Sequence, residues 1–153
     1  MNILISACLL GINCRYDGKS NKVSALSSIM DKYNLIPVCP EQLGGMTTPR
    51  FPSEIIGGKA SDVIEGKARV INNQGQDVTY HFIKGAEEAL NIAKIFNCKS
   101  AILKSKSPSC GYGAIYDGTF NGKLTNGNGI CTETLINNGI KVYSEKDIIY
   151  FIS

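Results

Sequence analysis

Four short apolar segments recur along this chain of 153 residues, and the stretches between them carry helical spacing or turn residues. The segments lie at residues 3–6, 34–39, 99–105 and 140–144. Short apolar runs bounded by turn-forming residues are typical of buried strands. Strands that alternate with helices favour a parallel sheet with helices on its faces. We therefore expect an α/β fold with a Rossmann-like, open and mainly parallel sheet, helices on both faces and a small hairpin insertion.

The stretches between these strands predict the other elements. Apolar residues at helical spacing predict helices within residues 23–33, 81–97 and 131–139, and Ser144 is expected to cap a last short helix. Residues 68–82 predict a small hairpin that turns at residues 72–75.

Two further segments are rich in Gly, Pro or Asn and predict loops. Residues 44–60 are expected to form a long functional loop, and residues 111–129 are expected to be mostly loop. No change in composition suggests a linker, so we expect a single domain over residues 1–153.

Composition and charge exclude several classes of protein. The net charge of +3 is mild, and no clustered stripe of Lys and Arg indicates a dedicated nucleic-acid surface, although RNA is not excluded. The apolar runs are too short to cross a bilayer, and no signal peptide is recognisable, so we expect a cytoplasmic protein without membrane contact. The six cysteines should stay reduced there, which favours metal or catalytic roles.

Three of the cysteines follow predicted strands. Cys8 comes after the first strand, Cys39 ends the second, and Cys110 lies a few residues after the third. Ligands of open parallel sheets bind beyond the carboxyl ends of the strands, so these cysteines are expected to meet at one edge. Soft thiolates select zinc, copper(I) or an iron–sulfur cluster, and a structural zinc site would need four ligands.

Three long motifs resemble the signature blocks of the thiouracil desulfidase family, formerly catalogued as a bacterial domain of unknown function. They read SACLLGINCRYDG, PVCPEQLGGMTTPRFPSEI and LKSKSPSCGYGAIYDGTFNGKLTNGNGI, and the resemblance runs from about residue 3 to residue 143. It implies a short, single-domain member with a cubane 4Fe–4S cluster. By motif, the cluster ligands would be Cys8, Cys39 and Cys110, and the fourth iron would stay open to substrate or hydrosulfide.

The resemblance also implies removal of sulfur from thiolated uracil, or a related thio-nucleobase, without redox turnover. Our hypothesis is that the open iron polarises the thiocarbonyl, water attacks the carbon, and sulfur leaves as hydrosulfide, which makes the reaction hydrolytic. Glu41 would be the general base, with pairing to an arginine as its structural alternative. Iron–sulfur assembly machinery is the partner that such a cofactor implies.

Other polar residues near the motifs have both a functional and a structural interpretation. Ser107 and Ser109 would bind the base edge or the leaving sulfur, with Ser109 in a catalytic role, or they would shape a turn. Arg15 and Asp17 would orient substrate or pair with each other. Arg50 invites the same two interpretations, with Glu54 as its expected partner, and Ser6 is a weaker candidate for substrate contact.

The remaining cysteines and the single histidine carry less weight. Cys14 is either close to the ligands or a fourth ligand, whereas Cys98 and Cys131 are expected to pack in the core. Nothing places His81 in the site.

Two competing functions stay open at this point. One is a zinc or cluster-binding module without turnover, and the other is a thiol enzyme that uses Cys110 as nucleophile. In the thiol enzyme, Lys104 and Lys106 would activate Cys110.

Overall fold

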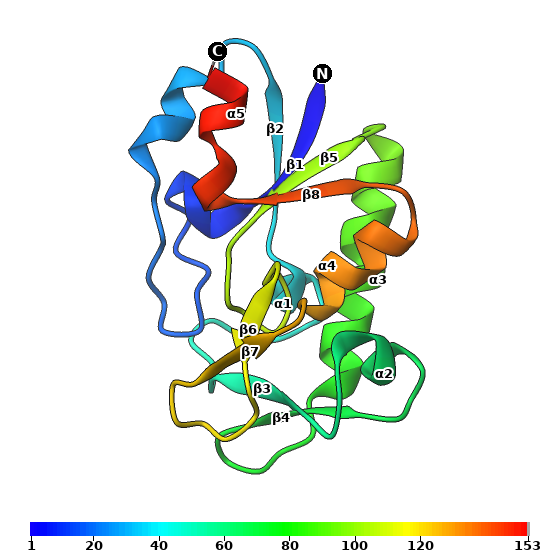
Figure 1. The fold of residues 1–153 in the computed structure, drawn as a ribbon. Coiled ribbons are helices and arrows are strands. Elements are labelled where there is room, and N and C mark those ends of the chain that lie inside the picture. Colours follow the sequence, from blue (N-terminus) through cyan, green and yellow to red (C-terminus); the bar gives the residue numbers. More distant parts are fainter. Residues whose placement is uncertain (153) are drawn as a thin grey trace.

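A four-stranded parallel sheet forms the centre of the computed structural model, which describes residues 1–152 (Figure 1). The strand order is β2-β1-β5-β8, and the strands are β1 (Asn2–Ser6), β2 (Asn34–Val38), β5 (Ser100–Leu103) and β8 (Lys141–Ser144). All three pairings are parallel, which confirms the expected open sheet.

Side chains alternate between the two faces of the sheet and so build two separate cores. Leu4, Ala101 and Leu103 pack into one cluster, whereas Ile3, Ile5 and Ile102 pack into the other. Successive residues of a strand point to opposite faces, so a central strand that is covered on both sides reads as a continuous apolar run. This is why the strands could be predicted from such short segments.

The helices α2 (Ala60–Ile64), α3 (Thr79–Ile95) and α4 (Ile130–Asn137) belong to the first core. The short helix α1 (Pro40–Leu43) begins directly after β2 and packs on α3. Gly44 and Gly85 allow this packing, because a Cβ atom at either position would collide with a backbone carbonyl of the other helix segment. The contact fixes α1, and therefore Glu41, relative to the sheet.

The second core is covered by short helical segments. They are η1 (Ala7–Leu10), η2 (Ser24–Ser28), η3 (Glu145–Asp147) and α5 (Ile149–Ile152). In α5, the ring of Phe151 packs edge-on against Tyr33 and Tyr143. Helical segments on both faces of the sheet confirm the predicted layer arrangement.

The predicted helix at residues 23–33 is wrong, since only the 3-10 turn η2 forms there. Leu26 and Ile29 are buried as the spacing suggested, but Met30 is exposed. Ser27 donates its hydroxyl to the carbonyl of Ser24, and such local bonds of serine compete with a regular helix. Helical spacing alone therefore identified the buried residues but not the backbone conformation.

Two small two-stranded antiparallel sheets extend the fold. The first pairs β3 (Ser53–Ile56) with β4 (Arg69–Asn72), and the second pairs β6 (Ala114–Tyr116) with β7 (Leu124–Asn126). Strand β3 lies inside the predicted loop 44–60. The stretch 68–82 turns at residues 72–75 as expected, but its strand pairs with β3, and helix α3 begins at Thr79.

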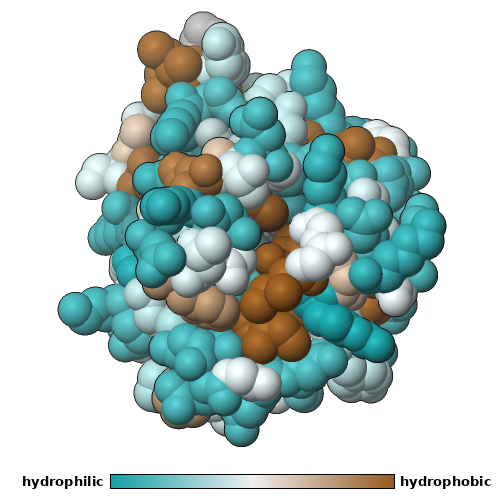
Figure 2. All heavy atoms as spheres, turned by 60° about the horizontal axis from the view of Figure 1, so that its bottom comes forward, coloured by the Kyte–Doolittle hydropathy of each residue, from teal (hydrophilic) through white to brown (hydrophobic). Residues whose placement is uncertain are grey.

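The surface shown in Figure 2 is the face that comes forward when the end carrying β3 and β4 is turned toward the viewer. A band of hydrophobic residues crosses its centre, and hydrophilic residues surround the band. Within residues 1–152, no helix combines the length and the apolar character that a membrane crossing demands.

Candidate active site

A pocket of about 650 Å³ lies where the strands β1, β2 and β5 end. Ser6 and Val38, the last residues of β1 and β2, line it, and so does Lys104, which follows β5. Four of the six cysteines also line it: Cys8, Cys14, Cys39 and Cys110. The rule that ligand sites form at the carboxyl edge of a parallel sheet therefore placed this pocket correctly.

Cys8 enters the pocket from η1, the turn that begins as soon as β1 ends. Its sulfur accepts a hydrogen bond of 3.5 Å from the amide of Asn21, and Arg15 holds the other end of that amide at 2.8 Å. Both contacts come from the loop that follows η1. This loop therefore supplies a polar wall beside the Cys8 thiol.

Cys39 precedes the first residue of α1, and Cys14 lies next to it. The Cys39 thiol is 3.7 Å from the carbonyl oxygen of Cys14. A hydrogen bond with the Cys14 side chain is the largest influence on Cys8 and on Cys39, and it lowers the pKa of each thiol to about 7. The same bonds raise the pKa of Cys14. Cys14 therefore belongs to the thiol group, a position that the sequence left open.

Cys110 lies in the loop after β5, close to the start of α4. Burial is the largest influence on its thiol and raises its pKa to about 12, although contacts with Ser6 and Ser109 oppose this. The loop is fixed by α4, because the amide groups of Ile130 and Cys131 donate to carbonyl oxygens of the loop. Free amides of a first helical turn need such acceptors.

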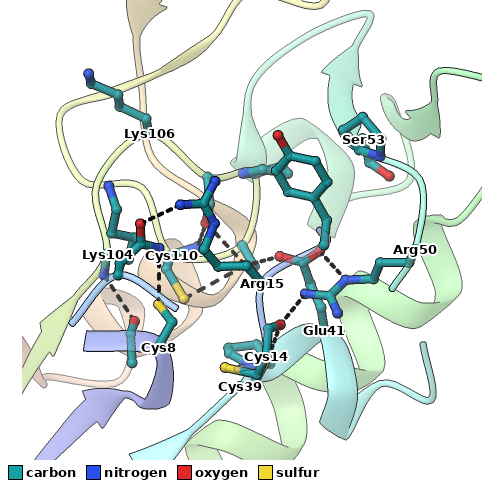
Figure 3. Close-up of a pocket in the computed structure, with 18 of the residues that line it drawn as sticks. Cys8, Cys14, Arg15, Cys39, Glu41, Arg50, Ser53, Lys104, Lys106 and Cys110 are labelled. Carbon is teal, nitrogen blue, oxygen red and sulfur yellow. Dashed lines mark hydrogen bonds and ion pairs between the residues drawn. The ribbon is translucent and has the colours of Figure 1, made fainter. Parts of the chain in front are cut away.

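The thiols do not converge on one point. Among residues 1–152, no three His, Cys, Asp or Glu side chains are grouped so that they could hold a metal ion. Cys8, Cys39 and Cys110 instead approach one pocket from three different segments (Figure 3). Each cysteine ligand of an iron–sulfur cluster binds a different iron atom, so separated soft donors around a shared space fit a multi-iron group better than a single ion.

Glu41 stands on the pocket wall in the first turn of α1. Its Oε1 accepts a hydrogen bond of 3.0 Å from Arg50 Nε, and its Oε2 accepts one of 2.9 Å from the hydroxyl of Ser109. The pair with Arg50 is well buried, with side-chain exposures of 5% for Arg50 and 16% for Glu41. The expectation that Arg50 pairs with Glu54 is wrong, because Arg50 points to α1.

The two serines beside Cys110 form a chain with Glu41. Ser109 donates to Glu41, and its oxygen lies 3.2 Å from the hydroxyl of Ser107. Because the hydroxyl of Ser109 donates its proton to Glu41, the hydroxyl of Ser107 must be the donor in its bond with Ser109. The oxygen of Ser107 in turn accepts the backbone amide of Cys110 at 2.7 Å. The structure thus brings Glu41, Ser107, Ser109 and Cys110 into one hydrogen-bonded line.

Glu54 binds backbone amides of the turn between β6 and β7. Its Oε1 accepts the amides of Gly118 at 2.8 Å and Phe120 at 3.3 Å, so it holds the turn of the β6–β7 hairpin at the pocket. Glu54 is only 8% exposed. No short sequence motif links Glu54 to this turn, which lies more than sixty residues away.

Arg15 and Asp17 are paired with each other at 3.1 Å, which is the structural interpretation of these residues. Arg15 also lines the pocket, whereas Asp17 is used inside the loop, where it accepts the amide of Lys19. The structure therefore brings Arg15 but not Asp17 to the pocket wall.

The lysines do not surround Cys110 as a thiol enzyme would require. Lys104 pairs with Glu145 at 3.1 Å, and Lys106 points away from the cysteines in Figure 3. A buried thiol with a raised pKa is a weak nucleophile. The structure therefore disfavours the thiol-enzyme alternative.

Asn21 and Glu145 were not predicted from the sequence as residues near the site. Glu145 follows β8 directly, so the same edge rule that located the cysteines could have found it. Asn21 carried no comparable signal. His81 lines a separate hollow of about 500 Å³, where its Nδ1 lies 2.7 Å from the carbonyl oxygen of Gly44. Cys98 and Cys131 are buried in the first core.

Comparison with known proteins finds similarity over almost the whole chain. The family described as 2-thiouracil desulfurase matches residues 3–147. The uncharacterized protein YbbK of Bacillus subtilis (strain 168) is 44% identical over 146 residues, which cover 95% of this chain and 97% of that protein. The solved structure of the 4Fe–4S-dependent thiouracil desulfidase TudS superposes with a TM-score of 0.87 at 38% identity and covers 98% of this chain and 94% of that one.

Proposed function

Because this chain belongs to the 2-thiouracil desulfurase family, we propose that it removes sulfur from a thiolated uracil with the help of a 4Fe–4S cluster. The observation that carries the proposal is the group of thiols of Cys8, Cys39 and Cys110 around one pocket with Glu41 on its wall. The likeness to TudS, whose name states dependence on a 4Fe–4S cluster, supports the choice of cofactor.

Cys8, Cys39 and Cys110 would hold the cluster. When bound, it would supply a Lewis acid for the sulfur atom of the substrate at an iron that no cysteine binds. Cys14 would serve beside the ligands, since it lines the same pocket and its carbonyl oxygen lies 3.7 Å from the Cys39 thiol. The proposal includes a cytoplasmic location and cluster delivery by iron–sulfur assembly machinery, because thiols stay reduced there.

The net reaction we propose replaces the thiocarbonyl sulfur by the oxygen of one water molecule and releases hydrogen sulfide. Carbon keeps its oxidation state and sulfur leaves as sulfide, so no electron donor or acceptor is needed. Glu41 would take the proton of the attacking water. The buried ion pair with Arg50 holds this carboxylate on the pocket wall, where it can accept a proton.

Ser107, Ser109 and Arg15 would bind and orient the substrate. The two hydroxyls form a line toward Glu41, so a proton could also pass through Ser109 to the carboxylate. Arg15 would donate to a carbonyl oxygen of the base, as its side chain lines the same pocket.

Anaerobic purification followed by iron and sulfide counting and a hydrogen sulfide assay with 2- and 4-thiouracil tests this function. We expect sulfide release by the loaded protein and none by cluster-free protein. Zinc in place of iron and sulfide, or a loaded protein that releases no sulfide, would contradict the proposal and favour a binding module.

A further inference from the structure

We infer that Arg50 is a positioning residue of this reaction, which holds the carboxylate of Glu41 so that only one of its oxygens is presented to the pocket. The inference rests on the proposed role of Glu41. Its basis is the Arg50 side chain, which is 5% exposed and lies between three segments of the pocket wall.

All three nitrogens of the guanidinium group are engaged. Nε donates to Glu41 at 3.0 Å, and Nη2 donates to the carbonyl of Cys14 at 2.9 Å. Nη1 donates to the carbonyl of Thr47 at 3.2 Å and to the hydroxyl of Thr48 at 2.9 Å. The guanidinium group is planar and rigid, so these four acceptors together fix its orientation.

The fork orients Glu41 because the last torsion of a glutamate side chain is broad. With Oε1 bound to Arg50, the remaining oxygen, Oε2, faces Ser109 at 2.9 Å. Without Arg50, the carboxylate could rotate, and Oε1 would be a buried acceptor without its cation. The hydrogen-bonded chain from Ser107 through Ser109 would then end on a carboxylate whose orientation is no longer fixed.

Arg50 also ties Glu41 to the cysteine loop. Its backbone amide donates to the carbonyl of Tyr16 at 2.8 Å, and its side chain holds the carbonyl of Cys14. The same carbonyl oxygen of Cys14 lies 3.7 Å from the thiol of Cys39. Arg50 therefore links the carboxylate of Glu41 to the loop that carries Cys14.

Arg15 offers a useful contrast in the same pocket. Its partners Asp17 and Asn21 lie on its own loop, and its side chain is 31% exposed. It therefore connects no other wall of the pocket. The geometry assigns the positioning role to Arg50 alone of these two arginines.

A double-mutant cycle separates positioning from a merely structural role. The variants are Arg50→Gln, Glu41→Gln and the double variant, each loaded anaerobically and assayed for kcat and KM with 2-thiouracil. We expect Arg50→Gln to lower kcat about 10- to 100-fold with KM changed less than about 3-fold. In the Glu41→Gln background the same change should lower kcat less than about 3-fold, because the residue through which Arg50 acts is already gone.

Iron content and the free energy of unfolding are measured for every variant. Arg69→Gln is the matched control, since Arg69 pairs with Asp77 on an exposed surface and should leave kcat and iron content unchanged. If Arg50→Gln fails to fold or load, Arg50→Lys and Arg50→Ala replace it. We expect Arg50→Lys to restore kcat only in part and millimolar guanidinium to raise the kcat of Arg50→Ala several-fold.

Four results would overturn the inference. Additive losses of kcat in the cycle, or an Arg50→Ala variant that guanidinium does not rescue, contradict it and leave the proposed function intact. A Glu41→Gln variant with wild-type kcat removes the role of Glu41, and positioning by Arg50 with it. Loaded wild-type protein that releases no sulfide defeats the proposed function itself.

Discussion

Two carboxylates, Glu41 and Glu145, hold opposite ends of the segment at residues 104–110, which carries Cys110. Glu145 accepts the backbone amide of Ser105 at 2.8 Å, the hydroxyl of Ser105 at 2.6 Å and the ammonium group of Lys104 at 3.1 Å. Glu41 accepts only side chains, from Arg50 at 3.0 Å and from Ser109 at 2.9 Å. Glu145 therefore binds the backbone of the segment as well as side chains, whereas Glu41 binds side chains only.

This difference separates a structural role of Glu145 from a catalytic role of Glu41. A carboxylate that satisfies a backbone amide fixes the course of the chain, and its loss leaves that amide unpaired. A carboxylate that contacts only side chains can exchange partners, as a general base must. Glu145 is therefore expected to contribute mainly to stability and Glu41 mainly to turnover.

Replacement of Cys110 between the two carboxylates should have the largest effect. We expect Cys110→Ala to lose iron and to reduce sulfide release to the background rate, because one of three soft ligands is removed. Iron analysis and the sulfide assay measure this. Cys98→Ala is the matched control, since Cys98 is buried away from the pocket and its replacement should leave the iron content unchanged. Equal loss of iron in both variants would argue against a ligand role.

Exchange of each carboxylate for its amide tests the comparison directly. We expect Glu41→Gln to lower kcat about 100-fold or more, because an amide cannot take a proton. Glu145→Gln should lower it less than about 10-fold, because Glu145 contacts no group that is expected to react. Steady-state assays of loaded protein measure both. A larger kcat loss for Glu145→Gln would reverse the assignment.

The free energy of unfolding should be lowered more by Glu145→Gln than by Glu41→Gln, which is the opposite order to the effects on kcat. We expect Glu145→Gln to lower the free energy of unfolding by about 1 to 3 kcal/mol, since charged acceptors of a buried amide and hydroxyl are worth about this much. Urea unfolding under anaerobic conditions measures it, and Glu41→Gln serves as the comparison.

The pH dependence sharpens this third prediction. Burial favours a raised pKa for Glu145, but the hydrogen bonds from Ser105 and the charge of Lys104 outweigh it and lower the pKa. Stability from a lowered carboxyl pKa is complete above the unfolded value of about 4.3 and is lost as the pH falls through the folded value. The urea midpoints of wild type and Glu145→Gln should therefore stay apart above about pH 4.3 and converge as the pH is lowered below that value. A gap that stays constant would contradict the role of the charge.

The smallest effect is expected for the exposed pair of Lys84 and Glu88 on α3. These side chains are 44% and 39% exposed and lie at positions i and i+4. We expect Lys84→Gln to leave the urea midpoint and kcat unchanged within experimental error. A loss as large as that of Glu145→Gln would show that burial does not govern these contributions.

The sequence allowed the sheet and the position of the thiols to be predicted, because both follow from local patterns. Buried parallel strands are short apolar runs, and the carboxyl-edge rule then located Cys8, Cys39 and Cys110. Strand β3 was not predicted, because Pro52 precedes its four residues and two glycines follow them. These turn-forming residues led to the prediction of a loop over residues 44–60.

The pairing of Arg50 with Glu41 could not be predicted in this way. Glu54 is nearer to Arg50 in sequence than Glu41 is, yet the loop that follows α1 directs Arg50 back to this helix. The role of Cys14 stayed open for the same reason, since the approach of its carbonyl oxygen to the Cys39 thiol depends on how two loops lie against each other. Such pairings are decided by tertiary structure, which a local pattern does not contain.

The metal and sulfide content of anaerobically isolated protein tests most directly the claim that Cys8, Cys39 and Cys110 share one inorganic core. The account predicts about four iron and about four acid-labile sulfide per chain, and loss of both when any one of the three cysteines is changed to alanine. Full retention of iron and sulfide in the Cys39→Ala variant, or a wild-type protein that binds one zinc and no sulfide, would contradict it.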